Sequence, residues 1–298
     1  NNTSVEFYAI DTNFNKMNVG GIFLDAQINE TYYKNLISDY QADSKIKLFV
    51  STDMEGAWTP FHSPESHQRF PFFSEINTAE EANEVGSKHG ELLKEIGFNL
   101  NFAPVAEYSD NVYGGRAFWG TEKEVADKIE AYIQGLQKSV LGTCKHYPGN
   151  SMKENLHDVS DEQTISAKDL YLFEICLKNN ISSIMVSHEI VSGVLNSSGK
   201  PSSVSKEVIS TIEDSILIIA DEINMRGLKD FYSDQIQLYT DLISSGENLI
   251  LDFELNPYQL YELIKRIERE VGVGKIDEKE IDKSVKKILM IKGYKVVA

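Results

Sequence analysis

The sequence predicts an α/β protein, a (β/α)8 barrel that forms a single domain over residues 1–298. Three observations indicate this fold: eight short apolar runs, helical segments between them, and acids and bases at the ends of several runs. Strands that alternate with helices pair in parallel through crossover connections. Eight strands in a chain of about 250 residues or more suit a closed barrel. An open, doubly wound sheet is the alternative.

The eight runs are short and rich in branched and aromatic residues, which is typical of buried strands. No glycine-rich phosphate loop, heptad repeat or interdomain linker interrupts their order, and this favours one domain. The predicted strands are residues 5–10, 20–24, 46–52, 98–105, 140–144, 183–187, 215–220 and 248–252.

The segments between the runs carry helix start signals. Thr78 with Glu81 and Thr121 with Glu124 have the spacing of a capping box, in which two side chains satisfy the first free N–H groups of a helix. Two more helices are expected to begin after positions 166 and 277. The last helix is expected to turn four apolar side chains toward the core: Ile281, Val285, Ile288 and Leu289.

Composition excludes several classes of function. The formal net charge of -17 argues against a nucleic-acid surface, which needs clustered Lys and Arg, and against tight docking on anionic lipid. No apolar stretch approaches the roughly 18 residues of a membrane span. We therefore expect a soluble protein. We also expect a monomer without a metal site. The chain begins at Asn1 and not Met, so we expect that an upstream tag or signal was removed, and cytoplasmic and exported locations both stay open.

The two cysteines, Cys144 and Cys176, fall on a predicted strand and a predicted helix. Their spacing does not match a metal site. Free cysteines are among the most buried residue types, so we expect two buried free thiols in preference to a disulfide.

Polar side chains follow the predicted strands where each strand ends. In a parallel barrel the carboxyl ends of the strands converge on one mouth, where active sites are built. An isolated Asp after a strand is more often a helix cap, but a set of acids and bases at several strand ends predicts one polar site. His62, His67 and His89 lack this context and are interpreted as structural or solvated. The candidate site residues are Asp53, Arg116, Lys145, His146, His188 and Asp221.

Several of these residues lie in longer motifs that follow one another along the chain. The most specific is Lys145-His-Tyr-Pro-Gly149, and it is accompanied by Asp53-Met-Glu-Gly56, Gly115-Arg-Ala-Phe118 and Met185-Val-Ser-His188. In this order the motifs resemble glycoside hydrolase family 3. Within that family the chain is similar to the single-domain β-N-acetylglucosaminidases that release N-acetylglucosamine from cell-wall fragments.

The resemblance implies a retaining exo-glycosidase that needs no cofactor and acts on peptidoglycan-derived amino-sugar glycosides such as muropeptides. Asp221 would be the nucleophile that forms a covalent glycosyl-enzyme, and His157 would be the acid/base. The hydroxyls of the terminal sugar would be bound by the remaining candidates, with His188 beside them: Asp53, Arg116, Lys145 and His146.

The chain departs from the family pattern near the site. Asn155 stands where the family has an Asp that orients the acid/base His, Trp58 replaces an Arg, Asn150 replaces a His, and Glu222 replaces an Asp. An Asn can orient an imidazole but cannot stabilise its charged form as a carboxylate does. Two alternatives therefore stay open: a β-glucosidase or β-xylosidase of the same family, and a non-catalytic glycan-binding protein on this scaffold.

Overall fold

The computed structural model of this chain describes residues 19–25, 30–61, 70–110, 112–149, 155, 157–158 and 160–296. These residues form two compact units. The first unit extends to Lys145 and also includes Lys168–Ser182, and the second comprises His146–Ala167 and the residues from Ser183 onward.

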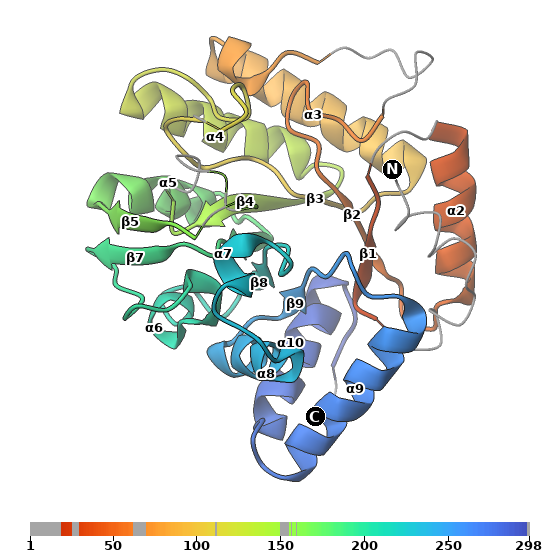
Figure 1. The fold of residues 1–298 in the computed structure, drawn as a ribbon. Helices are drawn as coiled ribbons and strands as arrows, with labels where there is room; N and C mark the ends of the chain where they lie inside the picture. Colours follow the sequence, from red (N-terminus) through yellow and green to blue (C-terminus); the bar gives the residue numbers. More distant parts are fainter. Residues whose placement is uncertain are drawn as a thin grey trace. The chain divides into compact units, whose positions relative to one another are not determined.

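The first unit is a parallel α/β layer. Its strands pair in chain order, with Gly21 opposite Phe49, Ser51 opposite Leu100 and Leu100 opposite Leu141. Buried apolar side chains fill the space between the strands and the helices drawn beside them in Figure 1. The elements are β1 (Gly21–Phe23), α2 (Glu30–Asp43), β2 (Phe49–Thr52), the 3-10 turn η2 (Phe73–Glu75), α3 (Ala79–Ile96), β3 (Leu100–Asn101), α4 (Glu122–Leu136), β4 (Leu141–Tyr147) and α5 (Ala167–Lys178).

The start signals of α3 and α4 are confirmed in atomic detail. The backbone N–H of Glu81 donates to the Thr78 hydroxyl at 3.1 Å, and the N–H of Thr78 donates back to the Glu81 carboxylate at 3.2 Å. The same reciprocal pair joins Thr121 and Glu124. Such a box satisfies two N–H groups that the helix itself cannot pair.

Glycine allows α3 and α4 to lie side by side at short distance (Figure 1). A methyl group added at Gly86 of α3 would lie 2.4 Å from the carbonyl oxygen of Tyr132, and one added at Gly135 of α4 would lie 2.3 Å from that of Asn83. Each glycine thus makes room for the backbone of the other helix. Tyr132 then reaches the buried imidazole of His89, whose Nδ1 lies 2.9 Å from the Tyr132 hydroxyl.

His89 is buried, as a structural residue would be, and its burial lowers its pKa to about 3, so it is neutral. His62 and His67 lie outside the described residues.

The prediction of two free thiols is wrong. Cys144 of β4 and Cys176 of α5 form a disulfide, with their Cα atoms 6.5 Å apart. The crossover from β4 to α5 brings the helix back over its own strand, and this separation lies within the range that a disulfide can bridge. Both residues are fully buried.

The second unit has its own parallel strands. Ser183 lies opposite Leu217, and Ile219 lies opposite Leu249. A separate parallel pair joins Glu162–Ile165 to Ile190–Gly193, which the strand pattern did not predict. The elements are β5 (Glu162–Ile165), β6 (Ser183–Val186), β7 (Ile190–Gly193), η4 (Ser202–Val204), α6 (Lys206–Ile209), β8 (Leu217–Ala220), α7 (Arg226–Lys229), α8 (Gln235–Ser245), β9 (Leu249–Ile250), α9 (Pro257–Gly272) and α10 (Glu278–Ile291).

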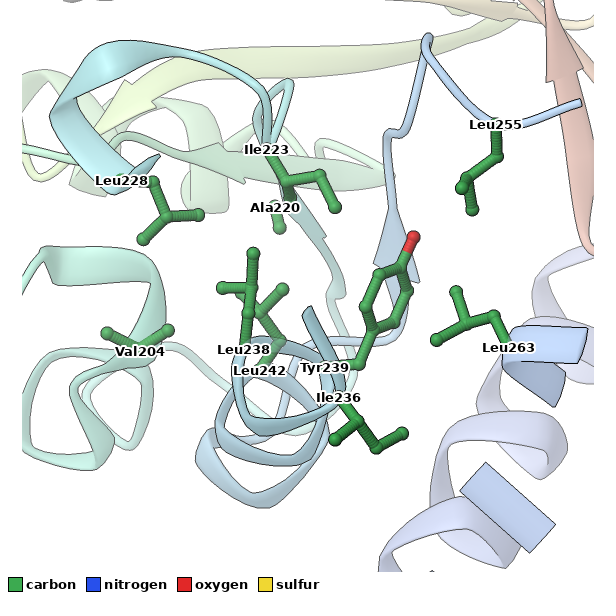
Figure 2. Packing of buried hydrophobic residues seen from close by; sticks show 10 residues of the cluster. All are labelled: Val204, Ala220, Ile223, Leu228, Ile236, Leu238, Tyr239, Leu242, Leu255 and Leu263. Carbon is green, nitrogen blue, oxygen red and sulfur yellow. The ribbon is translucent and has the colours of Figure 1, made fainter. Parts of the chain in front are cut away.

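A buried apolar cluster supports the end of β8. Figure 2 shows Ala220, the last residue of the strand, and Ile223 above the side chains of α8, with Leu238, Leu242 and Tyr239 beneath them. Ala220 and Ile223 flank residues 221 and 222. The cluster therefore packs against the turn that carries these two residues. Each fully buried Leu stabilises such a cluster by about 1.5–3 kcal/mol.

Seven of the eight predicted strands are confirmed, and the first, residues 5–10, lies outside the described residues. The α/β class is therefore correct, while closure into an eight-stranded barrel stays a prediction. The expectation for α10 is confirmed only in part: Ile281, Ile288 and Leu289 are half-buried, but no residue of this helix is fully buried and Val285 is 47% exposed. Periodicity places these apolar residues on one face but does not determine how completely another element covers it.

Candidate active site

Lys145 is the centre of a buried cluster of charges in the first unit. It occupies the part of β4 whose backbone pairs with residues 103–106, and its side chain is 2% exposed. Its Nζ donates to Asp53 Oδ1 at 2.5 Å and forms a second ion pair with Glu55. Asp53 and Glu55 directly follow β2, so two strand ends supply the cluster. The predicted association of Asp53 with Lys145 is therefore seen in the structure.

Glu55 joins both cations of this cluster. Its carboxylate pairs with Lys145 and accepts two hydrogen bonds from Arg116, one of them from Nη2 at 2.9 Å. Burial alone would raise the pKa of Glu55, but Arg116 and Lys145 together outweigh that effect and hold this pKa well below its usual range. Burial would likewise lower the pKa of Lys145, yet Asp53 and Glu55 raise it above its usual value. Both groups therefore stay charged.

Sequence reasoning did not single out Glu55, although it lies in the same motif as Asp53. The available signal was a second carboxylate two residues after the first, close to a Lys and an Arg that need counter-charges. A buried ion pair is stabilised only when further hydrogen bonds satisfy both groups, and here Arg116 donates to Glu55 while Lys145 also donates to Asp53.

The loop that presents Arg116 is held by Asp110. The carboxylate of Asp110 accepts backbone hydrogen bonds from Val112 at 3.1 Å, Tyr113 at 2.9 Å and Arg116 at 3.0 Å. The two glycines between Tyr113 and Arg116 have φ of 68° and 94°, a left-handed conformation that glycine adopts without strain. The loop thus holds the guanidinium of Arg116 within hydrogen-bonding distance of the Glu55 carboxylate.

A second cluster lies at the strand ends of the second unit. Asp221 follows β8, its backbone N–H donates to the Val186 carbonyl at 3.1 Å, and its side chain is 16% exposed. His146 Nε2 lies 4.0 Å from Asp221 Oδ2, which is longer than a hydrogen bond but close for two polar groups. The structure therefore brings the predicted nucleophile and the predicted sugar ligand His146 together.

His188 forms a hydrogen bond with the backbone of Glu222, the residue after Asp221. Its Nε2 lies 3.0 Å from the carbonyl oxygen of Glu222, which can only accept, so Nε2 carries the proton. Its Nδ1 lies 2.8 Å from the Ser203 hydroxyl, and burial lowers the pKa of His188. The neutral ring thus donates to Glu222 and accepts from Ser203. With both nitrogens engaged, His188 positions the turn that carries Asp221 and Glu222, and its predicted place beside the sugar stays a prediction.

Glu222 and Asp252 are two further carboxylates that sequence reasoning did not place among the candidate site residues. Asn224 links them: its Nδ2 donates to Glu222 Oε1 at 2.6 Å and to Asp252 Oδ1 at 3.1 Å. The Tyr239 hydroxyl donates to Asp252 Oδ2 at 2.8 Å. Burial raises the pKa of Glu222 to about 7, and the nearby charges of Asp221 and Asp252 add to this increase.

The structure describes His157 as an exposed residue in a short turn. The backbone N–H of His157 donates to the Asn155 side-chain oxygen at 3.2 Å, and the Asn155 amide donates to Asp158 at 2.7 Å. These two contacts of Asn155 shape the turn and do not involve the imidazole. Asn150 lies outside the described residues.

Within the described part of the chain, no group of three or more His, Cys, Asp or Glu side chains is placed to hold a metal ion. The same residues include no helix that is long and apolar enough to cross a membrane.

Comparison with known proteins decides the family. The model of the glycosyl hydrolase family 3 N terminal domain matches residues 8–291. The chain belongs to glycosyl hydrolase family 3. This confirms the family inferred from the motifs of Asp53 and Lys145. Among curated proteins, the family 3 chain is similar to beta-hexosaminidase A of Pseudoalteromonas piscicida, with 23% identity over 293 residues. That match covers 85% of the chain but 48% of the relative, so the chain spans about half the relative's length.

Solved structures of family 3 show the same fold. A glycosyl hydrolase from Mycobacterium smegmatis matches with a TM-score of 0.80 and 21% identity, over 93% of this chain and 89% of that one. A beta-N-acetylglucosaminidase from Paenibacillus sp. FPU-7 matches with a TM-score of 0.84 and 20% identity, over 97% of this chain and 60% of that one. At this identity the likeness concerns the fold.

Proposed function

We propose that this family 3 chain is a retaining, exo-acting β-N-acetylglucosaminidase that acts on peptidoglycan-derived amino-sugar glycosides. The observation that carries the proposal is Asp221, a carboxylate at the end of β8 with 16% side-chain exposure and His146 4.0 Å away. A carboxylate that is nearly enclosed but still open to a ligand suits attack on an anomeric carbon. The names of the relatives from Pseudoalteromonas and Paenibacillus support an amino sugar as substrate.

In the first chemical step, an Asp221 carboxylate oxygen attacks the anomeric carbon and forms a C–O bond. The bond from that carbon to the leaving-group oxygen breaks, and the proton that this oxygen needs comes from His157. In the second step, His157 removes a proton from water, the water oxygen attacks the same carbon, and the bond to Asp221 breaks. Two inversions retain the configuration, and the enzyme returns to its starting state.

The charged cluster of the first unit would bind the hydroxyl groups of the terminal sugar. Lys145 and Arg116 supply N–H donors, and Asp53, whose side chain is 41% exposed, supplies an acceptor. Glu55 is buried at 2% exposure behind them, so we assign it the role of positioning both cations. His146 would add a ligand beside the nucleophile. Such preorganised groups raise the rate only when their geometry is fixed before binding.

Hydrolysis of a chromogenic β-N-acetylglucosaminide tests the proposal. Asp221→Asn should abolish release of the chromophore, while Asp214→Asn, a change at a carboxylate with 82% exposure, should leave it intact. Wild-type protein that is inert across aryl β-glycosides would contradict the proposal. A preference for aryl glucoside or xyloside over N-acetylglucosaminide would support a β-glucosidase or β-xylosidase of the same family instead.

His157 has its own test. His157→Ala should depress hydrolysis most for poor leaving groups, because these need a proton in the transition state. Activated aryl leaving groups should suffer less in the first step. Equal losses for good and poor leaving groups would mean that His157 only shapes its turn, and the proton donor would have to be sought elsewhere.

A non-catalytic glycan-binding protein is the second candidate, and Asn155 favours it. Its side chain contacts the His157 backbone and Asp158, so the partner that stabilises a charged imidazole in the family is replaced by a turn-forming amide. Calorimetry that detects N-acetylglucosamine binding, together with no turnover of any aryl glycoside, would support this candidate. Measurable hydrolysis would dispose of it.

A further inference from the structure

Two aromatic side chains stand exposed next to the charged cluster of the first unit. Trp58 is 42% exposed and Tyr113 is 45% exposed. Their ring centroids are 5.8 Å apart, with an angle of 65° between the planes. In the resemblance to family 3, Trp58 is also the residue that stands in place of an Arg.

The pair is held in place by the groups that build the cluster. Trp58 and Glu55 exchange two backbone hydrogen bonds across a tight turn, at 2.8 and 3.2 Å. Tyr113 lies in the loop fixed by Asp110, and the Arg116 guanidinium carbon lies 5.3 Å from the centre of its ring. The buried Glu55–Arg116 ion pair joins the two turns. The charged partners therefore point inward, and the two aromatic rings remain outside.

Exposed aromatic rings held rigidly beside hydrogen-bonding groups suit a carbohydrate. A pyranose ring has an apolar face of C–H groups that packs on an aromatic ring, and its hydroxyls need polar partners at the edge. Tyr and Trp supply large contact area with little loss of side-chain entropy on binding. The net charge of -17 disfavours a polyanionic ligand such as a nucleic acid.

We propose that Trp58 and Tyr113 form a second sugar subsite, which stacks one pyranose ring of a β-linked oligosaccharide next to the ring bound by Asp53, Arg116 and Lys145. This inference rests on the proposed sugar-binding role of that cluster. It predicts a ligand of at least two sugar units, because a monosaccharide held at Lys145 does not extend over the aromatic pair.

The two tryptophans of the chain make a direct binding test possible. Trp119 is 58% exposed, and Trp119→Phe leaves Trp58 as the single tryptophan without altering the cluster. In that variant, combined with Asp221→Asn to prevent turnover, N,N′,N″-triacetylchitotriose should change the Trp58 fluorescence, while N-acetylglucosamine should change it much less.

Calorimetry on the Asp221→Asn protein then measures the subsite. Trp58→Ala should weaken chitotriose binding about 10-fold, equivalent to about 1.4 kcal/mol, and should weaken N-acetylglucosamine binding less. Trp58→Phe should restore most of the affinity for chitotriose and Trp58→Leu should not, because stacking needs an aromatic face and not merely an apolar one. Trp119→Ala is the matched control and should leave both affinities unchanged.

Three outcomes would overturn the inference: equal losses for mono- and trisaccharide in Trp58→Ala, full rescue by Leu, or a change of oligomeric state in Trp58→Ala that identifies the surface as a protein contact. Failure of the proposed function looks different. A chain that binds chitotriose through Trp58 but hydrolyses no glycoside would refute the enzyme and support the subsite. A chain that hydrolyses N-acetylglucosaminides, but shows neither a Trp58 fluorescence change nor a loss of chitotriose affinity in Trp58→Ala, would support the enzyme and refute the subsite.

Discussion

The disulfide between Cys144 and Cys176 offers a quantitative test of the structure. It closes a loop with a sequence separation of 32 residues between β4 and α5. In the chain-entropy treatment, a crosslink removes about 2.1 + 1.5R ln n cal/mol/K from the unfolded state, where n is the loop length. For this loop the sum is about 12 cal/mol/K. Reduction should therefore lower the free energy of unfolding by about 3.7 kcal/mol at 25 °C.

Tryptophan fluorescence is a suitable probe, because Trp58, Trp119 and the disulfide all belong to the first unit. Urea unfolding of the oxidised protein should show a higher midpoint than unfolding of the same protein with a strong reductant. Comparing two redox states of one sequence changes only the crosslink and leaves the core composition intact. A Cys144→Ala/Cys176→Ala variant is the control, since its midpoint should not respond to reductant.

Two results would refute the reasoning. Titration of two free thiols in the unreduced, unfolded protein would mean that the bond does not form. Identical midpoints with and without reductant, once reduction is verified, would mean that the loop contributes nothing to stability. A shift well below the expected value would instead indicate that the reduced, unfolded chain retains structure around β4 and α5.

Four further substitutions test the packing and charge of the fold by urea unfolding. Gly86→Ala should destabilise by about 1–3 kcal/mol because its methyl group meets a carbonyl of α4, whereas Gly272→Ala in α9, with open space around it, should stabilise by about 0.5–1 kcal/mol. Glu247 is buried without a hydrogen-bond partner, and burial raises its pKa well above its usual value, so the folded state holds the proton. The contribution of Glu247 to the free energy of unfolding is complete below about pH 4.5. Above that pH the contribution falls by about 1.4 kcal/mol per pH unit until the pH reaches the folded pKa. Glu247→Gln should remove this pH dependence. Glu55→Gln should cost about 3–5 kcal/mol, because it removes the buried carboxylate that Arg116 and Lys145 share and leaves Lys145 paired with Asp53 alone.

Each of these has a contradicting outcome. Equal effects at Gly86 and Gly272 would mean that the helices separate easily. The pH dependence of the free energy of unfolding should persist in Glu213→Gln, a change at an exposed carboxylate. Equal pH dependence in Glu213→Gln and Glu247→Gln would mean that Glu247 is not its source. A Glu55→Gln protein as stable as the wild type would show that solvent or Asp53 compensates the cations.

Local chemistry explains which elements could be predicted from the chain. A capping box such as Thr78 with Glu81 acts over three residues, and a buried strand such as Phe49–Thr52 shows itself by its own composition, so neither depends on distant parts of the fold. The positions of Asp53 and Lys145 after or within apolar strands were visible for the same reason. These features, and the collinear motifs of family 3, were properties of the sequence by itself.

The partners of these residues were decided only by tertiary structure. Glu55 meets Arg116 across 61 positions and Lys145 across 90, and Asn224 reaches Asp252 across 28, because strand register and the crossover of each helix set which side chains meet. The disulfide and the incomplete burial of α10 also depend on the tertiary fold. Periodicity identifies the face of a helix or strand, but only the packed fold determines what lies against it, how deeply it is buried, and therefore which carboxylates hold a charge.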